Sequence, residues 1–120
     1  MIKKLISFGY RHGKPNGEEL DEGTPFLCLD VRLWIKKNPF HNRKLRQLRG
    51  TDKAVQEDIL KTPGFELSYA KLRTRLLEPD LEGAVVYIGC TGGHHRSVFV
   101  VERLSHNLGV PLEHRDFYKK

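Results

Sequence analysis

The chain has 120 residues, 38% of them hydrophobic and 30% charged, which is typical of one soluble globular domain with a single core. Lysine and arginine exceed aspartate and glutamate by 21 − 15 = +6, which favours polyanionic partners, nucleic acid before anionic metabolites. No apolar run is long enough to span a membrane and the apolar start is too short for a signal peptide, so we expect a cytoplasmic, single-domain protein over residues 1–120.

Apolar runs bounded by turn residues predict the strands. They lie at residues 2–8, at 26–32, from residue 85 onward and, as a short last strand, at 112–115. The run at 26–32 is nearly all apolar, as in a strand that is covered on both faces. The intervening segment 34–50 has no clean period and contains Asn38-Pro39, which predicts a long loop.

Helices are predicted where apolar residues recur at helical spacing. Thr51 or Asp52 is placed to cap a helix that runs to about Lys61. A second helix ends before Pro79, and its apolar stripe consists of Phe65, Tyr69, Leu72 and Leu76. A third helix follows Ser97 and ends at Gly109. The alternation of strands and helices predicts an α/β fold, with a small and mainly parallel sheet flanked by helices.

The segment from Gly89 to Val98 joins a buried strand to a helix through a glycine pair. Gly92 and Gly93 allow close approach of the backbone, and free N–H groups at a helix N-terminus attract anions. Neighbouring side chains add positive charge and hydroxyl donors. We therefore expect a glycine-rich, anion-binding loop, with phosphate as the first candidate ligand. Its residues are Cys90, Thr91, Gly92, Gly93, His94, His95, Arg96 and Ser97.

Ligands of parallel sheets bind beyond the carboxyl ends of the strands. This rule brings further polar residues to the edge that carries the glycine loop, namely Arg11, His12, Asp30, Arg32 and the segment 114–116. Asp30 is placed to hold Arg32 or a histidine through a charge-assisted hydrogen bond; the alternative is an ordinary local ion pair between Asp30 and Arg32.

A basic stretch lies between residues 36 and 53. It holds seven basic side chains against the single acid Asp52: Lys36, Lys37, Arg43, Lys44, Arg46, Arg49 and Lys53. Such a stretch is either a solvated loop or an electrostatic footprint for a phosphate backbone.

Three chemistries suit the glycine loop. Five residues separate Cys90 from Arg96, and Ser97 follows, which is the spacing of tyrosine phosphatases. Gly89, however, stands where those enzymes carry histidine, and no general acid is evident. A metal site would draw on Cys90 and nearby histidines, yet no Cys-x2-Cys pair supports zinc. Noncatalytic recognition of a phosphate needs only donors and positive charge. The loop is not a Walker motif.

The segment Ile88 to Val98 resembles the strongest motif in the C-terminal domain of the RapZ family of RNase adapter proteins. Other segments resemble that domain in the same order: Ser7 to Gly13, Asp30-Val31-Arg32, Asn38-Pro39, Lys44-Leu45-Arg46, Gly50 to Lys53 and His114-Arg115-Asp116. The resemblance covers nearly all of the chain. Full-length family members also carry a Walker-motif domain, so we expect a stand-alone relative without it.

The resemblance implies an RNA-binding α/β domain that also holds an amino-sugar phosphate, glucosamine-6-phosphate, around the glycine loop. It implies small structured RNAs as partners, presentation of RNA to an endoribonuclease and assembly into homo-oligomers. The implied pocket comprises the loop residues 91–93 and 95–97, with Asp30 and Arg32 beside them. RNA contacts fall on Lys44, Arg46, Arg96, Arg115, Lys119 and Lys120. The family often has lysine at position 94, so His94 makes RNA affinity weaker and pH-sensitive.

The sequence therefore predicts a noncatalytic domain for RNA binding or metabolite sensing, without cofactor or metal. The alternative is a cysteine-dependent phosphatase that uses Cys90 and Arg96. A third possibility is a protein-interaction module whose basic surface serves an acidic partner.

Overall fold

The computed structural model describes residues 1–120 and has a four-stranded sheet as its centre. The strands are β1 (Lys4–Gly9), β2 (Phe26–Asp30), β3 (Val85–Cys90) and β4 (Leu112–His114), in the order β2-β3-β1-β4. All three pairings are parallel. The predicted α/β fold with a small parallel sheet is confirmed, and every strand has its carboxyl end at the same edge.

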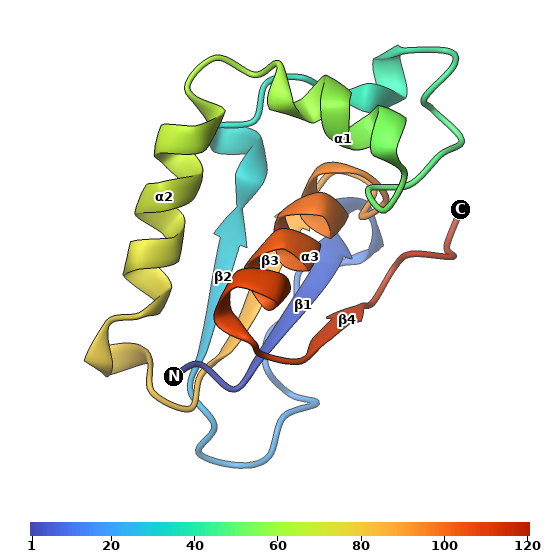
Figure 1. Ribbon diagram of the computed structural model, residues 1–120. Helices are drawn as coiled ribbons and strands as arrows, with labels where there is room; N and C mark the ends of the chain where they lie inside the picture. Colours follow the sequence, from blue (N-terminus) through green and yellow to red (C-terminus); the bar gives the residue numbers. More distant parts are fainter.

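The two faces of the sheet are covered differently. Alternate residues of the strands, such as Leu5 and Val86, face a core that includes side chains from all three helices. The opposite face carries a smaller cluster around Phe8 and Tyr87, covered by Tyr10 and Leu20 from the loop after β1. Figure 1 shows α3 lying across the sheet, with α2 alongside the β2 edge. The fold is therefore helical on one face and loop-covered on the other.

The helices are α1 (Lys53–Leu60), α2 (Phe65–Leu76) and α3 (Arg96–Leu108). On α2, Phe65, Tyr69 and Leu76 are buried, as the apolar stripe predicts. Gly109 ends α3 in the left-handed conformation, where the absence of a Cβ removes the strain. None of the helices combines the length and the hydrophobicity that a membrane span needs.

Three local predictions need correction. Strand β2 lies at the edge of the sheet, and its residues are half-buried or exposed rather than covered on both faces. It ends at Asp30, because residues 31–33 turn into a short 3₁₀ segment. Asp52 does precede α1, but its side chain accepts a hydrogen bond from the Arg49 N–H at 2.6 Å instead of capping the helix.

Candidate functional site

The loop Thr91 to His95 connects the end of β3 to the start of α3. Gly9, the last residue of β1, is in register with Cys90, the last residue of β3. Beyond this pair, the Arg11 N–H donates to the Thr91 carbonyl at 3.0 Å. The loop is thus seated on the carboxyl ends of the two central strands, where parallel sheets bind ligands.

The two glycines of the loop serve different purposes. Gly93 has φ +77°, and a Cβ there would lie 2.6 Å from the Gly9 nitrogen and 3.0 Å from the Asp116 Cβ. Position 93 therefore needs a glycine, because any side chain there would clash with the end of β1 and with Asp116. A Cβ on Gly92 would meet only the Arg11 guanidinium, at 3.8 Å. The space beside Gly92 is open to a ligand.

The backbone amides of this segment have no partner within the protein. No N–H group from Thr91 to Val98 donates to a backbone or side-chain acceptor, and the ladder of α3 begins with the Phe99 N–H, which donates to the His95 carbonyl at 3.0 Å. Unpaired N–H groups in a loop and in the first turn of a helix carry partial positive charge. Eight consecutive N–H groups thus lack an acceptor within the protein.

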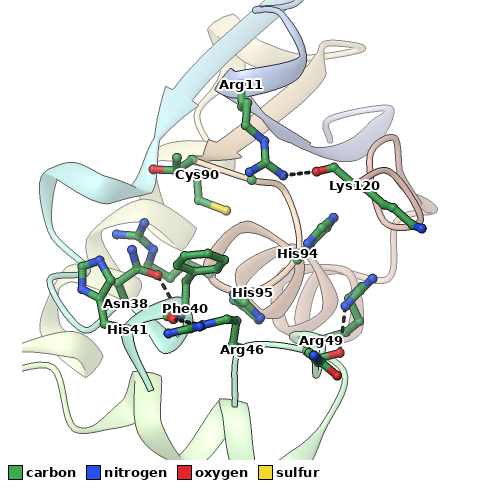
Figure 2. A pocket seen from close by; sticks show the side chains of 14 residues that line it. Arg11, Asn38, Phe40, His41, Arg46, Arg49, Cys90, His94, His95 and Lys120 are labelled. Carbon is green, nitrogen blue, oxygen red and sulfur yellow. Dashed lines mark hydrogen bonds between the residues drawn. The ribbon is translucent and has the colours of Figure 1, made fainter. Parts of the chain in front are cut away.

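A cavity of about 600 Å³ opens beside this loop (Figure 2). It is lined by the loop, by the basic segment before α1, by Arg11 and by the C-terminal tail. Five of its side chains are permanently cationic and none is acidic. The lining residues are Arg11, Asn38, Phe40, His41, Arg46, Gln47, Arg49, Cys90, Thr91, Gly92, His94, His95, Arg96 and Lys120. The cavity is strongly electropositive.

Arg96 and Cys90 form the floor of this cavity. Arg96 is only 6% exposed, and one of its guanidinium nitrogens donates to the Ile35 carbonyl at 3.1 Å. Burial lowers the pKa of Arg96, but an arginine remains charged at neutral pH. The Cys90 sulfur is buried and lies 3.1 Å from the Ser97 hydroxyl. A buried guanidinium with no carboxylate partner is a candidate anion ligand.

The two histidines hold neighbouring segments. The Nε2 of His95 lies 2.8 Å from the Leu48 carbonyl, so this nitrogen carries the proton and donates. The Nε2 of His94 donates in the same way to the Lys119 carbonyl at 2.5 Å. Burial lowers the pKa of both histidines, and Arg49 adds to the effect at His94. Both rings are therefore neutral at pH 7, and His94 titrates at a lower pH than a free histidine.

Asp30 and Arg32 form the predicted pair. Both oxygens of Asp30 accept from the Arg32 guanidinium, each at 2.9 Å. Burial opposes ionisation of Asp30, but these hydrogen bonds outweigh it and lower its pKa. Arg32 also reaches the Thr91 hydroxyl at 3.4 Å and lies 4.4 Å from the Tyr10 ring centroid. The pair flanks the loop without lining the cavity.

Asp116 anchors the C-terminal tail to the sheet. Its fully buried carboxylate accepts from the Gly9 N–H at 2.7 Å and forms ion pairs with Arg115 and Lys119. Burial alone would raise the pKa of Asp116, but these partners lower it to about 2. Arg115 and Lys119 are thereby committed to an internal acid, and neither lines the cavity.

Acidification should reveal the contribution of Asp116. A carboxyl group with a lowered folded-state pKa stabilises the protein above its ordinary pKa, and this stabilisation is lost as the pH falls toward 2. We expect Asp116→Asn to lower the free energy of unfolding by about 2 kcal/mol at pH 6 and by much less at pH 2. Urea unfolding of both proteins across this range measures the difference. A difference that does not change with pH would contradict the assignment.

The structure brings together most of the predicted site residues. Cys90, Thr91, Gly92, His94, His95 and Arg96 line the cavity, together with Arg46 and Lys120. Gly93, within the loop, and Ser97, in the first turn of α3, do not line the cavity, and Lys44 is exposed on the neighbouring segment outside it.

Six lining residues were not among the predicted site residues: Arg11, Asn38, Phe40, His41, Gln47 and Arg49. The sequence contains a signal for two of these six residues. Arg11 follows the end of a strand, and Arg49 lies within the basic stretch.

The structure bears differently on the two alternative chemistries, a metal site and a cysteine-dependent phosphatase. The protein holds no group of three or more histidine, cysteine or acidic side chains that is arranged to bind a metal ion. His114, the last residue of β4, contacts Ser7 and Glu102. The contact between Cys90 and Ser97 suits a phosphatase, but no carboxyl group lines the cavity to act as the general acid.

Comparison with known proteins agrees with this architecture. A family model described as the RapZ C-terminal domain matches residues 1–118. A protein of Heliobacterium modesticaldum named "Nucleotide-binding protein" is 38% identical, over 96% of this chain and 39% of its own length. A protein of the same name from Pseudothermotoga lettingae is 37% identical, over 98% of this chain and 43% of its own length. The chain thus spans about two fifths of the length of these curated relatives.

Proposed function

Since the chain belongs to the RapZ C-terminal domain family, we propose that it is a noncatalytic RNA-binding adapter domain that holds an anion beside its glycine loop. The anion is the phosphate of a phosphorylated sugar, with an amino-sugar phosphate as the first candidate, or a phosphate of RNA. The relatives named "Nucleotide-binding protein" are longer than this chain, and their name agrees with a phosphate-containing ligand.

One observation carries the proposal. Five cationic side chains and no acidic one line a cavity beside eight backbone N–H groups that have no protein acceptor. Amides at a helix N-terminus and arginine side chains are the donors that proteins use for phosphate. The cations Arg46, Arg49 and Lys120 extend this charge beyond the loop, so the same surface suits a phosphate chain.

Adapter activity adds partners to this proposal. It requires a structured RNA on the basic surface, an endoribonuclease to receive that RNA, and self-assembly of the domain into homo-oligomers. The family resemblance supports each of these. Light scattering of the purified chain, alone and with RNA, measures the assembly state.

RNA binding should depend steeply on salt. If the five cations of the cavity each neutralise one phosphate of a single strand, the slope of log K against log salt is about −3.5. Affinity for a structured RNA should then fall about 100-fold between 50 and 200 mM salt. Fluorescence anisotropy at several salt concentrations measures the slope. No binding at low salt would remove RNA from the proposal.

A phosphatase is the second candidate, because Cys90 lines the cavity and its thiol lies 3.1 Å from the Ser97 hydroxyl. In that reaction a Cys90 thiolate would attack phosphorus and a general acid would protonate the leaving group. Hydrolysis of an aryl phosphate that is lost in Cys90→Ser would favour the enzyme. RNA binding that persists in Cys90→Ser, without hydrolysis in the wild type, supports the noncatalytic function.

A further inference from the structure

Phe40 is an exposed aromatic side chain in a cavity that is otherwise built for charge. Its side chain lines the cavity, yet half of the residue remains accessible to solvent. Leaving an aromatic ring uncovered forgoes the stabilisation that its burial would provide. In Figure 2 the ring lies among the lining side chains, between Asn38 and His95. The position suits a ligand with an apolar, planar part.

The main chain of Phe40 is held by its neighbours. The Asn38 side chain accepts from the Phe40 N–H at 3.1 Å, and Arg46 Nε donates to the Phe40 carbonyl at 2.9 Å. Pro39, which is buried, restricts the backbone of the turn between Asn38 and Phe40. The Arg46 guanidinium lies 5.0 Å from the ring centroid, which is within cation–π range. Arg46 and Phe40 together form a cationic surface on which a planar group can stack.

We propose that the cavity takes an unpaired nucleotide, with its base stacked on Phe40 and its phosphate at the amides of the glycine loop. This inference rests on the proposed function and specifies the ligand. Aromatic and arginine surfaces stack unpaired bases, whereas phosphate alone needs no ring. A cavity of about 600 Å³ also lies within the range of small-ligand sites. Bases in a duplex cannot offer a face to Phe40, so the RNA contributes a loop, a bulge or a single-stranded end.

The test compares two ligands of equal charge. A ten-nucleotide adenosine oligoribonucleotide and an abasic ribose-phosphate oligomer of the same length differ only in their bases. By fluorescence anisotropy, the wild type should bind the adenosine oligomer about tenfold more tightly. Phe40→Ala should abolish this preference and Phe40→Trp should retain it. Leu67→Ala removes an apolar side chain of 65% exposure from α2 and serves as the matched control, with the preference intact.

The results separate the base-stacking proposal from the proposed function on which it rests. Equal affinity of the wild type for both oligomers, with the salt dependence intact, overturns base stacking and leaves the phosphate site standing. A preference that survives in Phe40→Ala overturns it as well. Thermal-shift assays with AMP and ribose 5-phosphate identify the source of the nucleotide, since a preference for AMP without one for the adenosine oligomer overturns the RNA assignment. Failure to bind either oligomer contradicts the proposed function itself.

Discussion

Arg96→Ala is expected to weaken the binding of inorganic phosphate and of sugar phosphates about 100-fold. Arg96 is a buried charge with no carboxylate partner, and truncating a buried group that pairs with a charge costs about 2–5 kcal/mol of binding free energy. The wild type should therefore be protected by these ligands against thermal unfolding, and the variant should not. Differential scanning fluorimetry with increasing glucosamine-6-phosphate measures the melting temperature of both proteins.

Two controls separate binding from folding. Arg96 also donates to the Ile35 carbonyl, so Arg96→Ala can lower the melting temperature without any ligand. Arg96→Lys retains the charge in place of the planar fork and should recover part of the protection. Arg73→Ala removes an exposed arginine of α2 and should leave protection unchanged. Equal protection of the wild type and both Arg96 variants would contradict our placement of the anion.

Gly93→Ala is expected to destabilise the fold by about 3 kcal/mol or more. An alanine at φ +77° is strained by about 1–2 kcal/mol. Its Cβ would also lie 2.6 Å from the Gly9 nitrogen and 2.9 Å from the Phe8 carbonyl carbon, and such overpacking costs about 1–3 kcal/mol. These neighbours are backbone atoms at the end of β1, so they cannot rotate away. Thermal unfolding should show a melting temperature about 10 °C lower.

Gly92→Ala provides the matched control within the same loop. Gly92 does not have a positive φ, and the nearest atom to an added Cβ is 3.8 Å away on the flexible Arg11 side chain. Stability should change by less than about 1 kcal/mol, while the methyl group occupies space beside the amides. Phosphate affinity should therefore fall in a protein that folds normally. Equal destabilisation by the two variants would contradict the different roles of the two glycines.

The sequence predicts the sheet and the loop because each depends on local patterns. β1 and β3 are mostly apolar, and the glycine pair follows β3 after the single residue Thr91. The confirmed parallel order then brings the carboxyl ends of these strands to one edge. The pairing of Asp30 with Arg32 was predictable for the same reason, since only one residue separates them in sequence.

The opposite wall of the cavity could not be predicted in this way. The segment before α1 has no periodicity, and it is held by long-range contacts to main-chain groups. The Gly50 N–H donates to the His94 carbonyl at 2.7 Å, and Arg49 Nε donates to the Phe117 carbonyl at 2.9 Å. The number of basic side chains in this segment does not reveal such contacts. Arg115 and Asp116 are adjacent in sequence, but their ion pair also depends on the burial of Asp116 against the distant Gly9 N–H, which no local pattern indicates.

The central claim is that an anion binds at the amides from Thr91 to Val98. Nuclear magnetic resonance of the ¹⁵N-labelled chain tests it most directly, because each N–H group gives its own signal. We expect addition of inorganic phosphate, and separately of the adenosine oligomer, to shift the signals of this segment most. Signals of α2, none of whose residues lines the cavity, should remain in place. Shifts confined to other surfaces, with the loop signals unchanged, would contradict the claim.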